Sequence, residues 1–325
     1  MKLPRRQFLY LAAGAAALPA VSRIARAQTY PARPVRWITG FSPGGVGDII
    51  ARLMAQWLSE RLGQQFVVEN QPGAGGNIAT EAVVRASADG YTLLLVVPPN
   101  AINATLYDKL NFNFVRDIAP VAGIASQPHI VVINLAVPAE SVPEFIAYAK
   151  ANPGKISMAS GGNGTTSHLA GELFKSMTGT DLVHVPYRGE AGALTELIGG
   201  RAQIYFGSAT ASLEHVRTRK LRSLAVTTTT RSKALPDLST VGEFLPGYEV
   251  SNWIGMGAPK DTPAEIIDRL NKEINAGLAD TKMTAQFADL GSSVLSSSSA
   301  EFGQLITHET HKWGKVIRAA GIKAQ

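Results

Sequence analysis

The fold is indicated by the sequence GFSPGGVGDIIARLM, residues 40–54, in which a glycine-rich turn leads directly into an amphipathic segment. Residues 35–39 precede the turn and are typical of a strand. Within residues 48–62, Ile49 and Leu53 recur at helical spacing, so the segment predicts a helix. Strand, glycine loop and helix in this order are the rhythm of a parallel sheet covered by helices.

The same pattern occurs three more times, in QPGAGGNIATEAVV (71–84), SGGNGTTSHLAGELF (160–174) and YRGEAGALTELI (187–198). The first turn of a helix has unpaired N–H groups and a partial positive charge, and glycine lets a ligand approach them. Four such loops together predict a shared site for an anion, either phosphate or carboxylate. Each loop taken alone is equally compatible with an ordinary tight turn.

Strands and helices alternate along most of the remaining chain. Three sequences have the spacing of capping boxes, namely Ser141 with Glu144, Thr262 with Glu265, and Ser298 with Glu301. Further strands are predicted at 65–69, 91–97, 130–134, 156–160, 182–185, 202–206 and 223–227, and further helices at 78–86, 141–150, 167–177, 190–198, 211–217, from 263 onward, 282–290 and 301–319.

The last third of the chain is helical and needs a surface to pack on, most simply the first strand–helix domain. The chain would then cross twice into an inserted second domain, through 121–134 and 247–258. We therefore expect an α/β protein with two lobes joined by two crossing strands, which is the organisation of a hinged ligand clamp. The first lobe would comprise residues 28–124 and 254–325, and the second lobe residues 125–253.

The N-terminus has the features of an export signal. Arg5 and Arg6 precede an apolar stretch, residues 8–21, that is too short to span a bilayer. Small residues at 25 and 27 predict cleavage between Ala27 and Gln28. The paired arginines favour a twin-arginine signal, and an ordinary secretory signal is the alternative. We expect a periplasmic protein without a lipid anchor.

Composition excludes several classes of function. The full chain has 31 basic and 25 acidic residues, and removing the five basic residues of 1–27 leaves 26 against 25. The remaining charge is close to neutral and gives no support for binding nucleic acid. Cysteine is absent, which excludes disulfides, cysteine-ligated metal sites and a thiol nucleophile.

Motifs of catalysis and of nucleotide binding are incomplete. The first, second and third loops lack the last glycine or alanine of the dinucleotide fingerprint, at Ile50, Ile78 and Ser167. There is no phosphate-binding G-x-x-x-x-G-K-[ST] motif and no G-x-S-x-G elbow. The segment 308–311, HETH, is one residue short of a zinc motif, and we expect it on the solvated face of a terminal helix. No cofactor and no metal are predicted, although an exported cofactor enzyme stays as an alternative.

The third loop is chemically the richest. Its hydroxyl and amide groups, on Ser160, Asn163, Thr165, Thr166 and Ser167, could bind an ionised carboxylate through neutral donors. His168 follows in the first helical turn, where it could face a ligand or serve as a core or capping residue. Arg188 in the fourth loop could add a charged donor or form a surface salt bridge.

The order and spacing of several motifs resemble a known family. These are YPARPVRWITGFSPGGVGDIIARLM, VVENQPGAGGNIATEAVV, MASGGNGTTSHLAGELF, VHVPYRGEAGALTELIGGRAQI and NWIGMGAPKDTPAEIIDRLN. Across nearly the whole chain after residue 27, the sequence resembles the substrate-binding receptors of tripartite tricarboxylate transporters, also called Bug-type proteins. The resemblance implies a two-lobed Venus-flytrap fold that captures small organic acids, without catalysis, for an uptake system or for sensing. Membrane components of the transporter would be the partners, and the receptor itself would be a monomer.

Ligand-binding positions follow from matching the family's motifs. Among these positions, Asp48 would cap the helix start or hold a water molecule and would not contact the ligand anion directly. In the first lobe the implied residues are Phe41, Ser42, Gly44, Gly45, Asp48, Gly76, Asn77 and Asn100. In the second lobe they are Ser160, Gly161, Asn163, Thr165, Thr166, His168, Tyr187, Arg188, Gly189 and Ser208.

One position departs from the family pattern. Many family members carry an acidic residue where this chain has Gly207. The glycine would leave room and remove a charge. The sequence therefore predicts a ligand that lacks an amine or is bulkier.

Overall fold

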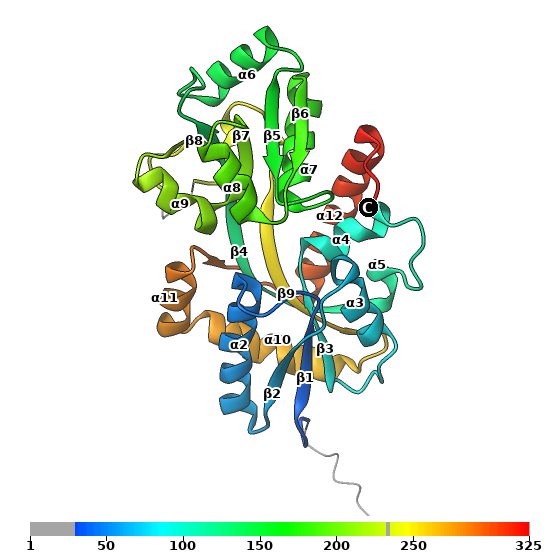
Figure 1. The fold of residues 1–325 in the computed structure, drawn as a ribbon. Coiled ribbons are helices and arrows are strands. Elements are labelled where there is room, and N and C mark those ends of the chain that lie inside the picture. The colour runs from blue at the N-terminus through cyan, green and yellow to red at the C-terminus, as the bar shows by residue number, and fades with distance from the viewer. Residues whose placement is uncertain (1–29, 232–234, 325) are drawn as a thin grey trace, which may run out of the picture.

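The structure is a computed structural model that describes residues 30–231 and 235–324. The predicted export signal, residues 1–27, lies outside this range. The chain forms two lobes, one above the other, connected by two long strands (Figure 1). The α/β fold with two lobes expected from the sequence is confirmed. Within the described ranges, no helix is long and apolar enough to cross a membrane.

The first lobe is built on three parallel strands, in which β1 pairs with both β2 and β3. Helices cover both faces of these strands because each strand is followed by a helix. Its elements are β1 (Val35–Thr39), α2 (Val46–Leu62), β2 (Phe66–Asn70), η1 (Ala74–Gly76), α3 (Asn77–Val84), β3 (Thr92–Val96), α4 (Pro98–Leu106), α5 (Phe114–Asp117), α10 (Ala264–Leu278), α11 (Thr281–Asp289) and β10 (Ser293–Val294).

The second lobe repeats the arrangement, with β5 pairing in parallel with β6 and β7. Its elements are α6 (Val142–Ala151), β5 (Ile156–Ser160), α7 (Thr166–Thr178), β6 (Leu182–Pro186), α8 (Glu190–Ile198), β7 (Ile204–Ser208), α9 (Ala209–Arg217), β8 (Leu221–Val226) and η2 (Val241–Glu243).

Strands β4 (Ile118–Asn134) and β9 (Ser251–Pro259) connect the lobes. The first half of β4 pairs with β9, and its second half pairs with β7 and β8, all antiparallel. These pairings join all ten strands into one sheet, ordered β2-β1-β3-β9-β4-β7-β5-β6, with β8 and β10 also on β4. Because β4 passes through both lobes, its central residues lie between them.

Each lobe has apolar cores on both faces of its strands. In the first lobe, Trp37 and Met54 pack with α10 and α11 on one face, and Ile38 packs with α3 on the other. In the second lobe, Phe145 and Phe174 lie in one core and Leu194 in the other. Burial of apolar area of this extent is the main force that holds the lobes together.

The C-terminal helix α12 (Ser299–Ala320) belongs to both lobes. Its Phe302 and Ile306 pack in the first lobe, whereas Trp313 and Ile317 pack with the α7 core of the second. At 22 residues it is about 33 Å long, which lets it reach across. The sequence analysis assigned residues 254–325 wholly to the first lobe, and these domain boundaries remain a prediction. The second half of α12 does not follow them, because it packs in the second lobe.

Two local predictions are wrong. Thr262 does not cap α10, because its Oγ1 donates to the Pro259 carbonyl and Pro263 occupies the N-cap. The prediction of a solvated HETH segment holds for His308 and His311, which are exposed, and is wrong for Glu309, which is 1% exposed and accepts hydrogen bonds from the indoles of Trp253 and Trp313. The Ser298 and Glu301 box does form at the start of α12.

Candidate ligand-binding site

A cavity of about 420 Å³ lies between the two lobes. Its walls come from the starts of five helices, α2 and α4 in the first lobe and α7, α8 and α9 in the second. The strands β4 and β9 close it from the side, through Gln127, His129, Asn252 and Ile254. The glycine loops before α2, α7 and α8 therefore meet at one place.

The first-lobe wall is the start of α2. Its N-cap is Gly45, and no side chain caps the free N–H groups there. The buried carboxylate of Asp48 is occupied, since it accepts from the Gly44 N–H (3.0 Å), the Arg52 guanidinium (3.0 Å) and the Asn70 amide (2.9 Å). The N–H groups at the start of α2 thus remain available to a ligand anion.

The ionisation of Asp48 follows from these contacts. Burial opposes the charge, but the hydrogen bonds from Arg52, Asn70 and Gly44 prevail and lower the pKa of the Asp48 carboxyl. Asp48 is therefore a permanently charged brace of the loop at neutral pH. Its contacts hold the glycine turn in the shape that presents the helix start.

The second-lobe wall at α7 consists of neutral donors. Gly161, Thr165, Thr166 and Ser167 line the cavity. The Ser167 hydroxyl accepts from the Gly161 N–H at 3.0 Å, and Thr165 is the N-cap of α7. The Thr165 hydroxyl also donates to the Gly162 carbonyl at 2.7 Å and lies 3.0 Å from the Ser167 hydroxyl, so these two hydroxyls fix the shape of the loop beside the cavity.

The start of α8 and the start of α9 form a different wall. No side chain caps α8 at Gly189. The Glu190 carboxylate lines the cavity and accepts from the hydroxyl (2.7 Å) and the N–H (3.3 Å) of Ser208, the N-cap of α9. The Glu190 carboxylate therefore occupies the N–H and hydroxyl donors of Ser208 at the start of α9.

Residues of β4 complete the site. His129 lies opposite Ser208 in the β4–β7 ladder. It is 3% exposed, and its Nδ1 has no partner among the described residues. Burial lowers the pKa of His129, and the nearby Glu190 offsets part of this effect. Gln127 is held by Ser292 and Asn252.

About half of the predicted ligand-binding positions line the cavity between the lobes. They come from loops that precede helices, which is the feature that the prediction used. Phe41, Ser42, Gly45, Asp48, Gly161, Thr165, Thr166, Gly189 and Ser208 line the cavity. The structure places Gly44, Gly76, Asn77, Asn100, Ser160, Asn163, His168, Tyr187 and Arg188 outside its lining.

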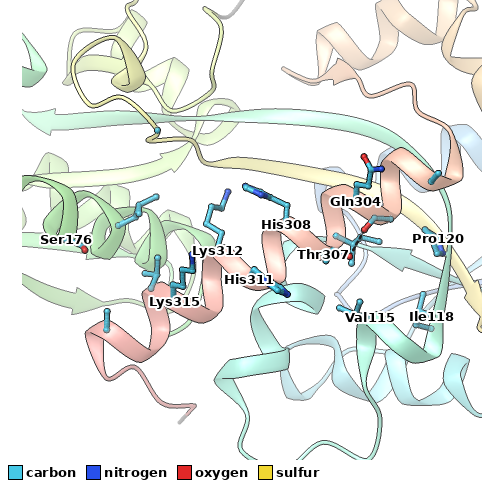
Figure 2. A pocket seen from close by; sticks show the side chains of 17 residues that line it. Val115, Ile118, Pro120, Ser176, Gln304, Thr307, His308, His311, Lys312 and Lys315 are labelled. Carbon is cyan, nitrogen blue, oxygen red and sulfur yellow. Dashed lines mark hydrogen bonds between the residues drawn. The ribbon is translucent and has the colours of Figure 1, made fainter.

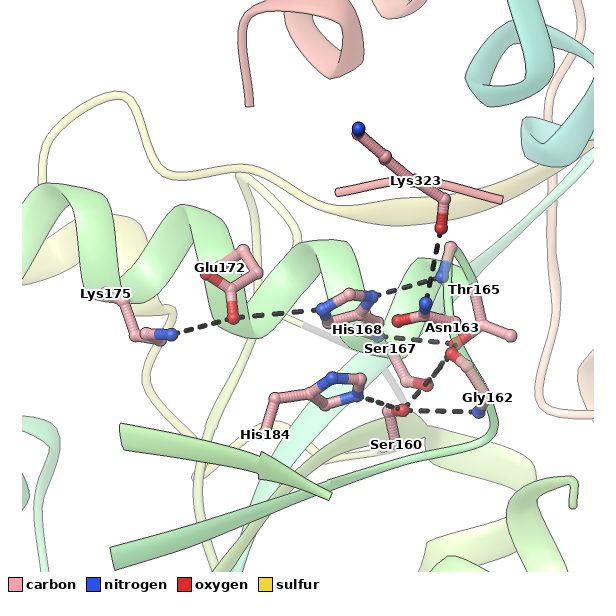
Figure 3. Close-up of polar contacts among 11 residues, drawn as sticks. Ser160, Gly162, Asn163, Thr165, Ser167, His168, Glu172, Lys175, His184 and Lys323 are labelled. Atoms are coloured by element: carbon pink, nitrogen blue, oxygen red, sulfur yellow. Dashed lines mark hydrogen bonds and ion pairs between the residues drawn. The ribbon is translucent and has the colours of Figure 1, made fainter. Parts of the chain in front are cut away.

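His168 and Ser160 support the third loop from behind (Figure 3). The His168 ring stacks on His184 at 3.6 Å between centroids, and its Nδ1 accepts from the Gly164 N–H. The Ser160 hydroxyl contacts His184 Nε2 at 2.6 Å. Burial chiefly lowers the pKa of His168 to about 3 and of His184 to about 4, so both rings are neutral at neutral pH.

The other outlying residues have structural partners or face solvent. Asn100 accepts from the Val97 N–H and donates to Thr80, which fixes the start of α4. Asn77 accepts from Asn103, and Asn163 donates to the Lys323 carbonyl near the C-terminus. Gly76 lies behind the Phe41 ring, Gly44 binds Asp48, Tyr187 packs beside the α8 core, and Arg188 is exposed.

The expectation of extra room at Gly207 is wrong. A Cβ at this position would overlap Cε1 of Tyr205, so the tyrosine ring already fills the space. The absence of a charge at position 207 stays a prediction about ligand choice, and Glu190 brings a carboxylate to the neighbouring Ser208.

Sequence reasoning missed Gln127, His129, Glu190 and Asn252. Gln127 and His129 lie within a strand and Asn252 near the start of another, where no local motif marks a site. Glu190 had a visible signal, since it directly follows Gly189 in the fourth loop.

A larger groove of about 1020 Å³ runs along α12 (Figure 2). His308, His311, Lys312 and Lys315 line it, together with Val115 and Ile118. Lys312 is paired with Glu249 at 3.0 Å and with Glu309. The starts of α5 and α12 reach the groove through Val115 and Ala300, and both are capped by side chains, those of Asn113 and Ser298.

Comparison with known proteins decides the family. The pattern described as "Tripartite tricarboxylate transporter family receptor" matches residues 50–322. The chain belongs to this receptor family. The family's members are periplasmic solute-binding receptors, and the recognition made from the sequence motifs is confirmed.

Three relatives illustrate the similarity. The chain is 36% identical to Protein BugT of Bordetella pertussis, over 91% of this chain and 92% of BugT. It is 35% identical to the solved structure of R. palustris Rpa4515 with adipate, with a TM-score of 0.78 and coverage of 90% and 99%. It is 28% identical to MatC from Rhodopseudomonas palustris with bound malate, with a TM-score of 0.74 and coverage of 89% and 100%.

Proposed function

We propose that this family member captures a small organic acid in the cavity between its lobes. The observation that carries the proposal is the uncapped start of α2, which lines the same cavity as the uncharged polar residues at the start of α7. A carboxylate placed at the helix start would gain hydrogen bonds and a favourable helix dipole. The relatives with adipate and with malate support a carboxylate ligand.

The proposed role is binding without catalysis. The Ser160–His184 pair could suggest a nucleophile and base, but Ser160 is fully buried beneath the loop and also contacts the Gly162 carbonyl. Such a pair supports the loop rather than a reaction. We further propose that the export signal is removed between Ala27 and Gln28, and that the monomeric receptor serves a tripartite transporter or a sensing system.

Thermal unfolding with added acids tests the proposal. The full chain is expressed, purified from the periplasm and heated with monocarboxylates, dicarboxylates, tricarboxylates, aromatic acids and amino acids. At one hundred times its dissociation constant, a ligand stabilises the fold by about 2.7 kcal/mol. We expect a clear shift for one class of acid, whereas no shift with any acid would contradict the proposal.

A further inference from the structure

The charge of the cavity differs between its two ends. At the first-lobe end, the acid of α2 is neutralised, because Asp48 is paired with Arg52. At the second-lobe end, Glu190 has no cationic partner among the described residues; it accepts from the N–H and hydroxyl of Ser208 and lies near the Tyr205 hydroxyl. One end is thus suited to an anion, and the other end presents an anion of its own.

His129 lies beside this second end. It is opposite Ser208 in an antiparallel ladder, where facing Cβ atoms lie about 5 Å apart. Its backbone is held on both sides by Thr227, whose hydroxyl donates to the His129 carbonyl at 3.0 Å. The ring is therefore fixed, and its buried Nδ1 is left without a protein partner in the described ranges.

The Glu190 carboxylate lines the cavity without a cationic partner among the described residues, so a ligand group that donates a hydrogen bond to it gains affinity. An ionised Glu190 can only accept hydrogen bonds, whereas a neutral histidine offers one donor and one acceptor. A hydroxyl or an ammonium group can donate a hydrogen bond to Glu190. A second carboxylate would instead lie against Glu190, and like charges repel.

We propose that Glu190 and His129 form a specificity subsite for a hydrogen-bond donor at the far end of the ligand. The ligand class is a carboxylic acid that carries a hydroxyl or an ammonium group opposite its carboxylate. Its carboxylate lies at the start of α2 and its donor lies at Glu190. The inference rests on the proposed function, because it takes the carboxylate end from there.

Apolar residues between the two ends fit such a ligand. Leu95, Val97 and Ile254 line the cavity between the helix starts. A short carbon chain would contact them while its two polar ends reach opposite walls. Titration with acids of two lengths identifies the preferred length of the ligand's carbon chain.

The test is calorimetric titration with two matched series of acids. The four-carbon probes are butyrate, 4-hydroxybutyrate, 4-aminobutyrate and succinate, and the six-carbon probes are hexanoate, 6-hydroxyhexanoate, 6-aminohexanoate and adipate. For the series of the preferred length, we expect an acid with a hydroxyl or ammonium group to bind about tenfold tighter than the diacid. Comparison of the hydroxy and amino acids identifies the donor.

Glu190→Gln removes the charge and keeps the shape of the side chain. We expect it to reduce the preference for the donor-bearing acid over the diacid by about tenfold. Glu196→Gln is the matched control, because Glu196 lies on the same helix but pairs with Arg201 outside the cavity lining. It should leave the preference unchanged.

The outcomes separate the two proposals. If the diacid binds as tightly as the donor-bearing acid, or if Glu190→Gln leaves the ratio unchanged, the subsite is wrong while carboxylate capture stands. If none of the eight acids binds, and the wider set of acids also gives no thermal shift, both proposals are contradicted.

Discussion

Two acidic residues occupy similar places in the two lobes but have different surroundings. Asp48 and Glu190 both lie in the first turn of a helix that follows a glycine loop. Asp48 is 5% exposed and accepts from Arg52, Asn70 and Gly44, so its charge serves the loop. Glu190 accepts from Ser208, lies near the Tyr205 hydroxyl and faces the cavity without a cationic partner among the described residues. The comparison teaches that an acid at a helix start can brace a binding loop or select a ligand, depending on whether a cation neutralises it.

The largest expected effect comes from making the α2 start resemble the α8 start. Gly45 has extended backbone angles (φ −73°, ψ 159°), and a Cβ there would meet no atom within 4 Å. Gly45→Asp would therefore be tolerated and would cap α2 with its own carboxylate. We expect the affinity for the organic acid to fall about a hundredfold, measured by calorimetric titration, because two anions compete for the same N–H groups.

The matched control is Gly45→Ala, which adds a Cβ without a charge. It should leave the dissociation constant within about threefold, since nothing competes for the helix dipole. Equal losses in both variants would mean that the start of α2 does not bind the anion.

Removal of the bracing acid is expected to have the next largest effect. Asp48→Ala removes an acceptor of the half-buried Asn70 amide and of the Gly44 N–H, and it removes the ion-pair partner of Arg52. The free energy of unfolding should fall by about 2 kcal/mol, measured by urea denaturation. Asp89→Ala is the control and should cost less than about 1 kcal/mol, because its pair with Arg33 is exposed. A similar loss from Glu190→Ala would contradict the distinction between the two acids.

The contribution of Asp48 should also depend on pH. Its pKa is lowered in the folded state, so the charged form is favoured by folding. This stability is present in full above the unfolded pKa of about 3.9 and is lost as the pH falls through the lower folded pKa. The difference between the original chain and Asp48→Ala, measured by denaturation at pH 7 and at pH 3, should therefore narrow in acid. A constant difference would show that charge is not the source.

The smallest effect is expected at Arg188. This residue was predicted to contact the ligand, but the structure leaves it exposed and outside the lining of the cavity. Arg188→Ala should change the dissociation constant by less than about twofold. A tenfold loss would place the arginine in the site, as the motif comparison implied.

The fold could be predicted because its signals are local. The strand predicted at 156–160 and the helix starts after the glycine loops depend on residues adjacent in sequence. Burial within α12 could not be predicted in the same way. Glu309 is buried because Trp253, 56 positions away, lies over it.

The candidate site was predictable where it consists of loops and unpredictable where it depends on pairing between distant elements. Thr165 and Gly45 are marked by their place before a helix. The role of Glu190 depends on Ser208, 18 positions later, and that of His129 on the register of β4 with β7. His168 has the right sequence position for a ligand contact, but its ring stacks on His184 instead.

The most direct test of carboxylate capture is a crystal structure of the protein with the acid that gives the largest thermal shift. We predict the carboxylate within hydrogen-bond distance of the N–H groups at the start of α2, facing Thr165 and Thr166 across the cavity. An acid bound instead in the groove along α12, with the cavity between the lobes unoccupied, would contradict the account.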